Sequence, residues 1–390
     1  MSGAPDRDEA FLTAIRRIAD EVAAPNADDV DRAARFPIEA IDALKAEGAL
    51  SAFVPVELGG GGISFEAIAA ACFELGRRCG ASAMVFAMHQ IQVACIVRHL
   101  DDAPWFATYL GSLVTEQRLI ASATSEVGSG GDMSRSVAAL TPGEDGLVHF
   151  EKQAPTVSYG AHADDLFTTL RRSPDAEPGD QIVVLTSHDQ VTLEQMGTWD
   201  PLGMRGTCSP GYTIRAAFPA EQVLPTAFTV VATESMVPIS HILWSHLWLG
   251  IATDAFDRAR AFVRAQAKRT PDQQPPAAQR LSHLMSELSL LRAEVSSALP
   301  DFMAASEGGR ERLSTMASIL RFNNLKIAAS EQAPRVCQGA MGVCGIVGYK
   351  NDTPFSIGRH LRDTMSASLM IANERIHQTN AGLLLIAKDV

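Results

Sequence analysis

Hydroxyl groups and glycines are concentrated between positions 124 and 132 in a way that suits ligand binding. This run, Thr-Ser-Glu-Val-Gly-Ser-Gly-Gly-Asp, directly follows a short stretch typical of a strand. Its backbone N–H groups and short hydroxyls could contact a phosphate or the polar edge of a flat heterocycle. An ordinary turn explains the same composition equally well. The sequence contains no GxxxxGK[ST], HExxH or GxSxG motif.

Composition excludes several classes of function. The 390 residues include 33 Lys and Arg against 45 Asp and Glu, a net charge of −12. This balance argues against a nucleic-acid-binding protein, which needs basic residues to neutralise phosphates. No apolar run approaches the ~20 residues that span a bilayer, and the first nine residues do not resemble a secretory signal. The six cysteines form no CxxC or zinc-type cluster. We therefore expect a cytoplasmic protein with no metal, nucleic-acid or membrane partner.

The elements that would position these residues fall into three regions. Apolar residues recur at helical spacing in residues 1–118, short β-type runs separated by polar turns fill residues 119–230, and long helical patterns occupy residues 231–390. The last of these patterns predicts a single helix over residues 360–387. The fold class predicted is α+β, mainly α, with an N-terminal helical domain, a middle β-barrel or sandwich and a C-terminal helical bundle.

Five short motifs in this order resemble those of the acyl-CoA dehydrogenase family. They are carried by residues 54–64, 121–132, 152–164 and 202–207, and by the series Gln338, Gly342, Tyr349, Pro354, Arg362 and Asp363. The resemblance covers most of the chain. It implies a four-helix C-terminal bundle, subunits that pair as a homodimer or homotetramer, and FAD between the β-domain and the bundle. It also implies the residues that contact FAD: Ser125, Gly130, Thr156, Ser158, Asn373 and, reaching the partner's cofactor, Gln338.

The sequence departs from the family pattern where the family keeps its catalytic base. Counting from Asp363, the position of the usual glutamate is Ile371. Other branches keep the base on the first helix of the C-terminal bundle, and anchoring on Gly250 places Ser240 at that position. Neither side chain can act as a base near neutral pH. The strand tryptophan is missing from residues 153–157, and the segment that contacts the diphosphate across the dimer is reduced to residues 268–271.

Three residues could take the place of the base. Glu374 lies three positions beyond the expected site, although it could instead pair with Arg375 on a helix surface. His241 has a near-neutral reference pKa and would face the site if the alignment holds. His89 and Ser240 are expected to border the substrate cavity, as flavin monooxygenases of this fold use a histidine near the position of His89. A hydrogen-bonded core histidine is the alternative for both His89 and His241.

The function predicted from the resemblance is an FAD-dependent oxidoreductase. It would catalyse α,β-dehydrogenation of an acyl thioester carried on coenzyme A or an acyl-carrier protein, with Glu374 or His241 removing the α-proton. Electrons would pass to an electron-transfer flavoprotein or to O₂. One alternative is a flavin-dependent monooxygenase on the same fold, which needs no such base. Another is a non-catalytic subunit that binds flavin or acyl ligand and supports an active partner.

Overall fold

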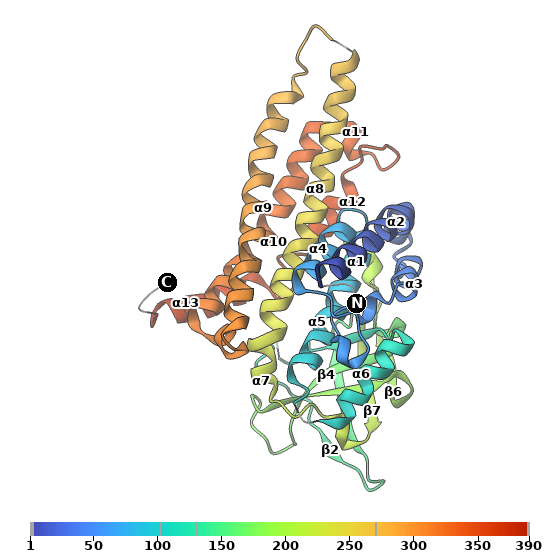
Figure 1. Cartoon of the computed structure of the whole chain (residues 1–390), viewed down its shortest axis with the longest axis vertical. Helices are drawn as coiled ribbons and strands as arrows, with labels where there is room; N and C mark the ends of the chain where they lie inside the picture. The colour runs from blue at the N-terminus through green and yellow to red at the C-terminus, as the bar shows by residue number, and fades with distance from the viewer. Residues whose placement is uncertain (1–3, 102, 130–131, 270, 388–390) are drawn as a thin grey trace.

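The N-terminal part of the chain is helical. The computed structural model describes residues 4–101, 103–129, 132–269 and 271–387 (Figure 1). Ser64 starts one of the helices, because its side chain accepts a hydrogen bond from the backbone N–H of Ala67. Pro104 occupies the first turn of another helix, where its missing N–H is not needed. The six helices are α1 (Ala4–Ile18), α2 (Ala24–Ala33), α3 (Ile38–Ala46), α4 (Phe65–Gly76), α5 (Gly80–His99) and α6 (Pro104–Glu116).

Helix α5 is the central helix of this region. By length and hydropathy it could cross a membrane, so the sequence does contain an apolar run of the length that we expected to be absent. However, 89% of its most apolar window is buried inside the protein. A helix that is apolar on all sides is expected in a protein interior. The packing of α5 therefore explains its composition.

The middle of the chain forms two small sheets packed against each other. One sheet has the order β1-β4-β5, with β1 and β4 parallel, and the other is antiparallel with the order β2-β3-β7-β6. Both sheets contribute apolar side chains, including Leu166 and Ile214, to a shared core. The strands are β1 (Ile120–Ala123), β2 (Thr141–Pro142), β3 (Val148–Ala154), β4 (Asp165–Arg171), β5 (Gln181–Ser187), β6 (Val191–Met196) and β7 (Gly211–Phe218).

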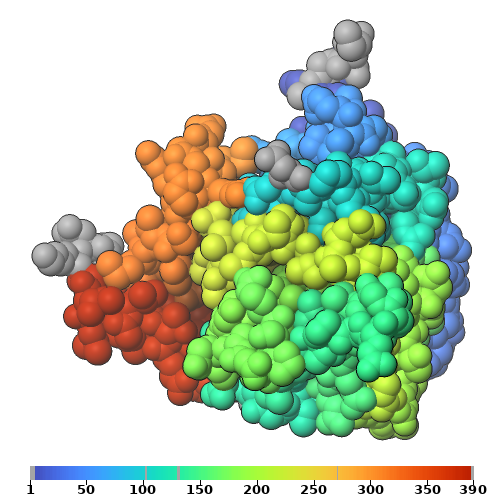
Figure 2. All heavy atoms as spheres, turned by 90° about the horizontal axis from the view of Figure 1, so that it is seen from below, coloured from blue at the N-terminus to red at the C-terminus, as the bar shows by residue number. Residues whose placement is uncertain are grey.

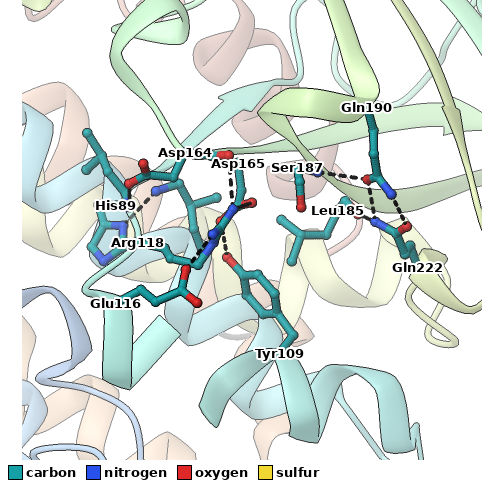
Figure 3. A network of polar contacts seen from close by, with 12 residues as sticks. His89, Tyr109, Glu116, Arg118, Asp164, Asp165, Leu185, Ser187, Gln190 and Gln222 are labelled. Carbon is teal, nitrogen blue, oxygen red and sulfur yellow. Dashed lines mark hydrogen bonds and ion pairs between the residues drawn. The ribbon is translucent and has the colours of Figure 1, made fainter. Parts of the chain in front are cut away.

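A polar network joins the N-terminal helices to this β-domain (Figure 3). Asp165, at the start of β4, accepts two hydrogen bonds from the guanidinium of Arg118, at 2.6 and 2.8 Å, and a third from the Tyr109 hydroxyl at 2.7 Å. The Asp165 side chain is fully buried, and its carboxylate is matched by three donors. Because a buried charge is tolerated only when it is paired and hydrogen-bonded, this network holds α6 against β4 in one arrangement.

Long helices form the C-terminal part, as predicted. Helices α8 (Val237–Arg269), α9 (Ala277–Glu307) and α10 (Met316–Cys344) run side by side along the long axis of the molecule, with the β-domain at their lower end (Figure 1). A short helix and a π-helical segment, residues 232–236, lead into α8. The remaining helices of this part are α7 (Phe228–Val231), α11 (Ile346–Tyr349), α12 (Gly358–Met365) and α13 (Asn373–Leu384).

The single helix predicted over residues 360–387 is wrong, because two helices with a turn between them occupy this stretch. α12 ends at Met365 and α13 begins at Asn373. In the turn, Ile371 has a φ of +46°, a left-handed conformation that is strained for a β-branched residue. Figure 2 shows the red C-terminal segment beside the green residues of the β-domain. The break in the helix therefore places a turn next to the β-domain.

The domain boundaries at positions 119 and 231 remain a prediction. They agree with the positions of the described elements, since α6 ends at Glu116, the described strands lie between Ile120 and Phe218, and α7 begins at Phe228.

Candidate active site: two cavities on either side of a strained turn

The first cavity, which we call the hydroxyl cavity, has a volume of about 410 Å³. It lies between the β-domain, α5 and the turn that follows α12. One part of its wall is polar, with hydroxyl side chains from the ends of β3 and the start of β7. The rest is rich in methionine and also includes Arg362 and Ser366. The hydroxyl residues of the β-domain are Thr156, Ser158, Thr207 and Ser209, and the methionines are Met84, Met88, Met204, Met365 and Met370.

The hydroxyls are connected to one another by hydrogen bonds. Ser209 Oγ donates to Ser158 Oγ at 2.9 Å and lies 2.8 Å from Thr207 Oγ1. Ser125 Oγ, from the loop after β1, donates to the backbone carbonyl of Thr156 at 2.9 Å. Three segments far apart in the sequence therefore meet at one polar edge. Such an edge can exchange donor and acceptor roles to suit a ligand, because a hydroxyl does both.

Two contacts hold the opposite wall in place. Gly203 lies so close to α12 that a Cβ atom there would be 2.0 Å from the carbonyl oxygen of Arg362, so only glycine fits. Beside it, the backbone N–H of Met204 donates to Asp363 Oδ1 at 2.7 Å. Burial raises the pKa of Asp363 to about 6. The two motifs that contain these residues, 159 positions apart, are thus in direct contact.

The second cavity, which we call the His241 cavity, has a volume of about 570 Å³. It lies between the start of α8, α10, α13 and the loop after β1. Most of its wall is apolar, and opposite charges, Asp132 and Arg375, are both part of the lining. Residues lining it include Met133, Phe228, Ala232, Thr233, Val237, Pro238, His241, Leu313, Ile319, Phe322, Asn323, Ile371, Ile376, Gln378 and Thr379.

His241 is almost completely buried, with 1% of its surface exposed. Its Nδ1 lies 3.1 Å from the backbone carbonyl of Phe322, and its Nε2 has no hydrogen-bond partner among the described residues. Burial, reinforced by the nearby charge of Lys326, lowers the pKa of His241 to about 3. The imidazole is therefore neutral at physiological pH and is a weak base.

Lys326, which was not predicted from the sequence as a site residue, donates hydrogen bonds to the turn between the two cavities. Its side chain is fully buried, and Nζ donates to the carbonyl oxygen of Ile371 at 2.8 Å and to Asn373 Oδ1 at 2.7 Å. Burial lowers the pKa of Lys326 to about 7. A lysine on the otherwise apolar face of α10, between the buried Leu325 and Ala329, was the available signal. Lys326 keeps the carbonyl of the strained Ile371 turned toward α10.

The predicted flavin contacts are only partly brought together. Ser125, Thr156 and Ser158 share the polar edge, with Thr156 and Ser158 lining the hydroxyl cavity. Asn373 lines neither cavity, because it is buried against Lys326, Ser330 and Glu331 of α10. Gln338 is exposed on α10, and Gly130 lies outside the described residues.

The candidate bases do not gather at either cavity. Glu374 is exposed at the start of α13 and lines neither cavity. Ser240 is buried, donates to the carbonyl of Val237 at 2.8 Å and lines neither cavity. His89 lines neither cavity either, since both ring nitrogens are bonded to backbone groups. Nε2 lies 2.7 Å from the Leu50 carbonyl, and Nδ1 accepts the Ile120 N–H at 3.0 Å. Of the three candidates, only His241 lines a cavity.

Two sequence profiles match the chain. Residues 5–104 match the acyl-CoA dehydrogenase N-terminal domain, and residues 242–373 match the acyl-CoA dehydrogenase C-terminal domain, together more than half of the chain. The chain belongs to the acyl-CoA dehydrogenase family. It is a member of a family of flavin-binding enzymes. The human mitochondrial short-chain specific acyl-CoA dehydrogenase is 24% identical over 372 residues, covering 92% of this chain and 85% of the relative.

Solved structures with different reactions share the fold of this acyl-CoA dehydrogenase family member. Dibenzothiophene monooxygenase TdsC from Paenibacillus sp. A11-2 has a TM-score of 0.80 at 20% identity, covering 97% of each chain. Butyryl-CoA dehydrogenase from Megasphaera elsdenii has a TM-score of 0.80 at 19% identity, covering 99% of this chain and all of the other. At these identities the likeness shows the fold and leaves the reaction open.

The hydroxyl cavity has the chemistry that a flavin ring requires. The isoalloxazine is a flat ring system with hydrogen-bonding atoms along one edge and apolar faces. Thr156 and Ser158 offer hydroxyl groups along one edge of the cavity, and Ser125 bonds the backbone carbonyl of Thr156 beside them. Methionine side chains on the other walls can contact an aromatic face through their polarizable sulfur. The residues present therefore fit a flavin.

Proposed function

We propose that this family member is a flavin-dependent monooxygenase that holds a reduced flavin ring in the hydroxyl cavity and an organic substrate in the His241 cavity. The absence of a suitable base carries the proposal. Among the described residues lining the two cavities, the one carboxylate is Asp132. Its Oδ1 accepts hydrogen bonds from the side chain and backbone of Ser134, which lower its pKa. Removal of an α-proton instead needs a carboxylate whose pKa is raised toward neutral.

In this proposal the reduced flavin would supply the electrons with which O₂ is activated. The chain itself would supply position. The hydroxyls of Thr156 and Ser158 would hold the polar edge of the ring. The buried Met84 and Met204 would cover part of its faces. Lys326 fixes the turn at Ile371, which lines the His241 cavity directly after Met370 of the hydroxyl cavity. Substrate and flavin would thus meet across one short turn.

We further propose that the ring is the main source of flavin affinity, so that FMN and FAD bind within a few-fold of each other. FAD was the form implied by the motifs. The reduced diphosphate-contacting segment at residues 268–271 and the FMN-bound structure of TdsC support a smaller role for the adenylate half. Titration of the flavin-free protein with FMN and with FAD, followed by quenching of flavin fluorescence, measures the ratio directly.

Dehydrogenation of an acyl thioester is the second candidate. The nearly full-length similarity to an enzyme named for acyl-CoA dehydrogenation favours it. In that case Glu374 would have to reach the substrate from its exposed place at the start of α13. An acyl-CoA or acyl-carrier protein would be the substrate, and an electron-transfer flavoprotein would accept the electrons.

One pair of experiments separates these functions. Anaerobic titration of the flavin-loaded protein with acyl-CoAs of different chain length would bleach the visible flavin band if the protein is a dehydrogenase. We expect no bleaching. Instead, flavin reduced by a separate NADH-dependent reductase should support oxygen-dependent product formation from an apolar substrate. Bleaching by any acyl-CoA overturns the proposal, and a protein that binds flavin but does neither would be the non-catalytic subunit.

Assembly of this protein as a homodimer or homotetramer is part of the same proposal. The exposed Gln338 on α10 is free to contact a partner's cofactor. Sedimentation at micromolar concentration should show a species of at least two subunits, and a monomer would contradict this.

A further inference from the structure

The ring of His241 has one nitrogen in use and one without a partner. Its Nδ1 lies 3.1 Å from the carbonyl oxygen of Phe322, and a carbonyl can only accept a hydrogen bond. Nδ1 must therefore carry the proton. This leaves a lone pair on Nε2, which can only accept. Nε2 is buried and has no partner among the described residues.

Three donors of neighbouring residues on α8 and α10 are already committed to other acceptors. The ammonium of Lys326 donates to Ile371 and Asn373. The hydroxyls of Ser240 and Ser245 donate to backbone carbonyls of α8. A buried acceptor without a donor is costly, so a ligand that donates a hydrogen bond to it gains affinity.

Trp244 presents the complementary group one turn further along α8. Its ring centroid is 6.4 Å from that of His241, and its buried Nε1–H also has no partner in the described part of the chain. An acceptor and a donor thus lie without partners on adjacent turns of the same helix. A hydroxyl group satisfies either kind of atom, because it donates and accepts.

The lining of the His241 cavity limits the rest of the ligand. Its walls are largely apolar, with Phe228, Pro238 and Phe322 among them, and the charges of Asp132 and Arg375 are opposite in sign. Apolar walls favour an uncharged body, because a charged one would lose its hydration without gaining a partner of its own. The volume of about 570 Å³ is sufficient for one or two rings.

We propose that His241 is a recognition residue whose Nε2 accepts a hydrogen bond from the hydroxyl group of an uncharged, mainly apolar ligand in the His241 cavity. This rests on the proposed function in that the ligand is its substrate. An acyl thioester, which has no hydroxyl at its reacting end, would leave Nε2 unsatisfied. The site therefore distinguishes ligands that carry a hydroxyl donor from ligands that lack one. A buried hydrogen-bonding group provides this kind of selectivity.

Calorimetric titration with 4-ethylphenol and 1-ethyl-4-fluorobenzene tests this. The two probes have nearly the same shape and differ in the donor. We expect the wild-type protein to bind the phenol about tenfold more tightly, the effect of one well-formed hydrogen bond. His241→Phe should bind the two within twofold of each other. His246→Phe, a buried histidine of the same helix that lines neither cavity, should behave as wild type.

A preference that survives in His241→Phe, equal binding of both probes by wild type, or no binding of the phenol overturns the proposal. If His241→Phe does not fold, the wild-type protein still decides. The ¹⁵N resonance of His241 Nε2 should shift on addition of the phenol and stay in place with the fluorinated probe, and the same shift with both would overturn it. These measurements need no turnover. The binding measurements can thus contradict the recognition role of His241 without contradicting oxygenation, and a failure of oxygenation would leave the binding result unchanged.

Discussion

Two buried histidines, one on α5 and one on α8, differ in how many of their ring nitrogens are bonded. His89 lies where α5 meets β1, and Figure 3 shows it beside the network around Asp165. His241 lies where α8 meets α10. Both are almost completely buried, and burial lowers the pKa of each, to about 4 and about 3. His89 bonds backbone groups through both nitrogens, whereas His241 uses one.

The comparison teaches that burial and pKa do not separate a structural histidine from a functional one. Both side chains are neutral and inaccessible to solvent, and a sequence reader would assign them the same roles. The number of satisfied nitrogens separates them. Both nitrogens of His89 are bonded, while His241, a residue of the cavity lining, keeps one buried acceptor without a partner among the described residues.

The strongest test removes the bonded histidine. His89→Ala leaves the Leu50 carbonyl and the Ile120 N–H without partners and creates a cavity, so we expect a loss of about 3–5 kcal/mol in the free energy of unfolding. Urea denaturation of His89→Ala and His241→Phe measures the difference. His241→Phe should lose less than about 1.5 kcal/mol, because it removes one bond and fills the same space. Equal losses would contradict the comparison.

Acid should destabilise the protein through both histidines alike. In the folded state the pKa of His89 is about 4, and in the unfolded state it is close to its ordinary 6.5. Between these values the unfolded chain binds more protons, so stability is highest above pH 6.5 and falls as the pH drops toward 4, by about 3 kcal/mol for such a shift. Denaturation at pH 7.5 and 4.5 should show this slope reduced in His89→Gln and in His241→Phe. An unchanged slope in both would show that neither is buried in the neutral form.

The hydroxyl cavity should respond independently of His241. Ser158→Ala removes one hydroxyl from the polar edge and the acceptor of the Ser209 hydrogen bond, so flavin affinity should fall about three- to tenfold. His241→Phe should leave flavin affinity within twofold of wild type, because it lines the other cavity. Fluorescence quenching of bound flavin measures both. A large loss in His241→Phe would mean that the two cavities are one binding site.

The smallest effect is expected from Glu374→Gln. Glu374 is exposed and lines neither cavity, so its substitution should change unfolding free energy by less than about 0.5 kcal/mol and flavin affinity by less than twofold. Anaerobic reduction of the flavin by acyl-CoA is the decisive readout. A loss of about 10²–10⁴ in that rate would identify Glu374 as a base and restore dehydrogenation as the function.

The order of the regions and part of the site could be read from the sequence. Helical and β-type patterns predicted the helix–sheet–helix order, and the strands near Leu166 and Ile182 are found as β4 and β5. The resemblance implied Ser125, Thr156 and Ser158 as flavin contacts, and in the structure Ser125 bonds Thr156 while Ser158 bonds Ser209. That these residues bind flavin remains a prediction. The single C-terminal helix was wrong, because Lys326 of α10 bonds the carbonyl of Ile371 and the turn there ends the helical pattern.

Local patterns predicted the order of the helical and β regions, because hydrophobic periodicity acts between near neighbours in the chain. Counting from the motif at Asp363 placed Ile371 where the family keeps its carboxylate. Only the tertiary structure decided which polar atoms are satisfied. The partners of His89 are 31 and 39 residues away, and Phe322 is 81 residues from His241. Whether a hydrogen bond forms depends on the donor–acceptor distance to within a few tenths of an ångström. No pattern in a single sequence contains the distance between atoms of such separate segments.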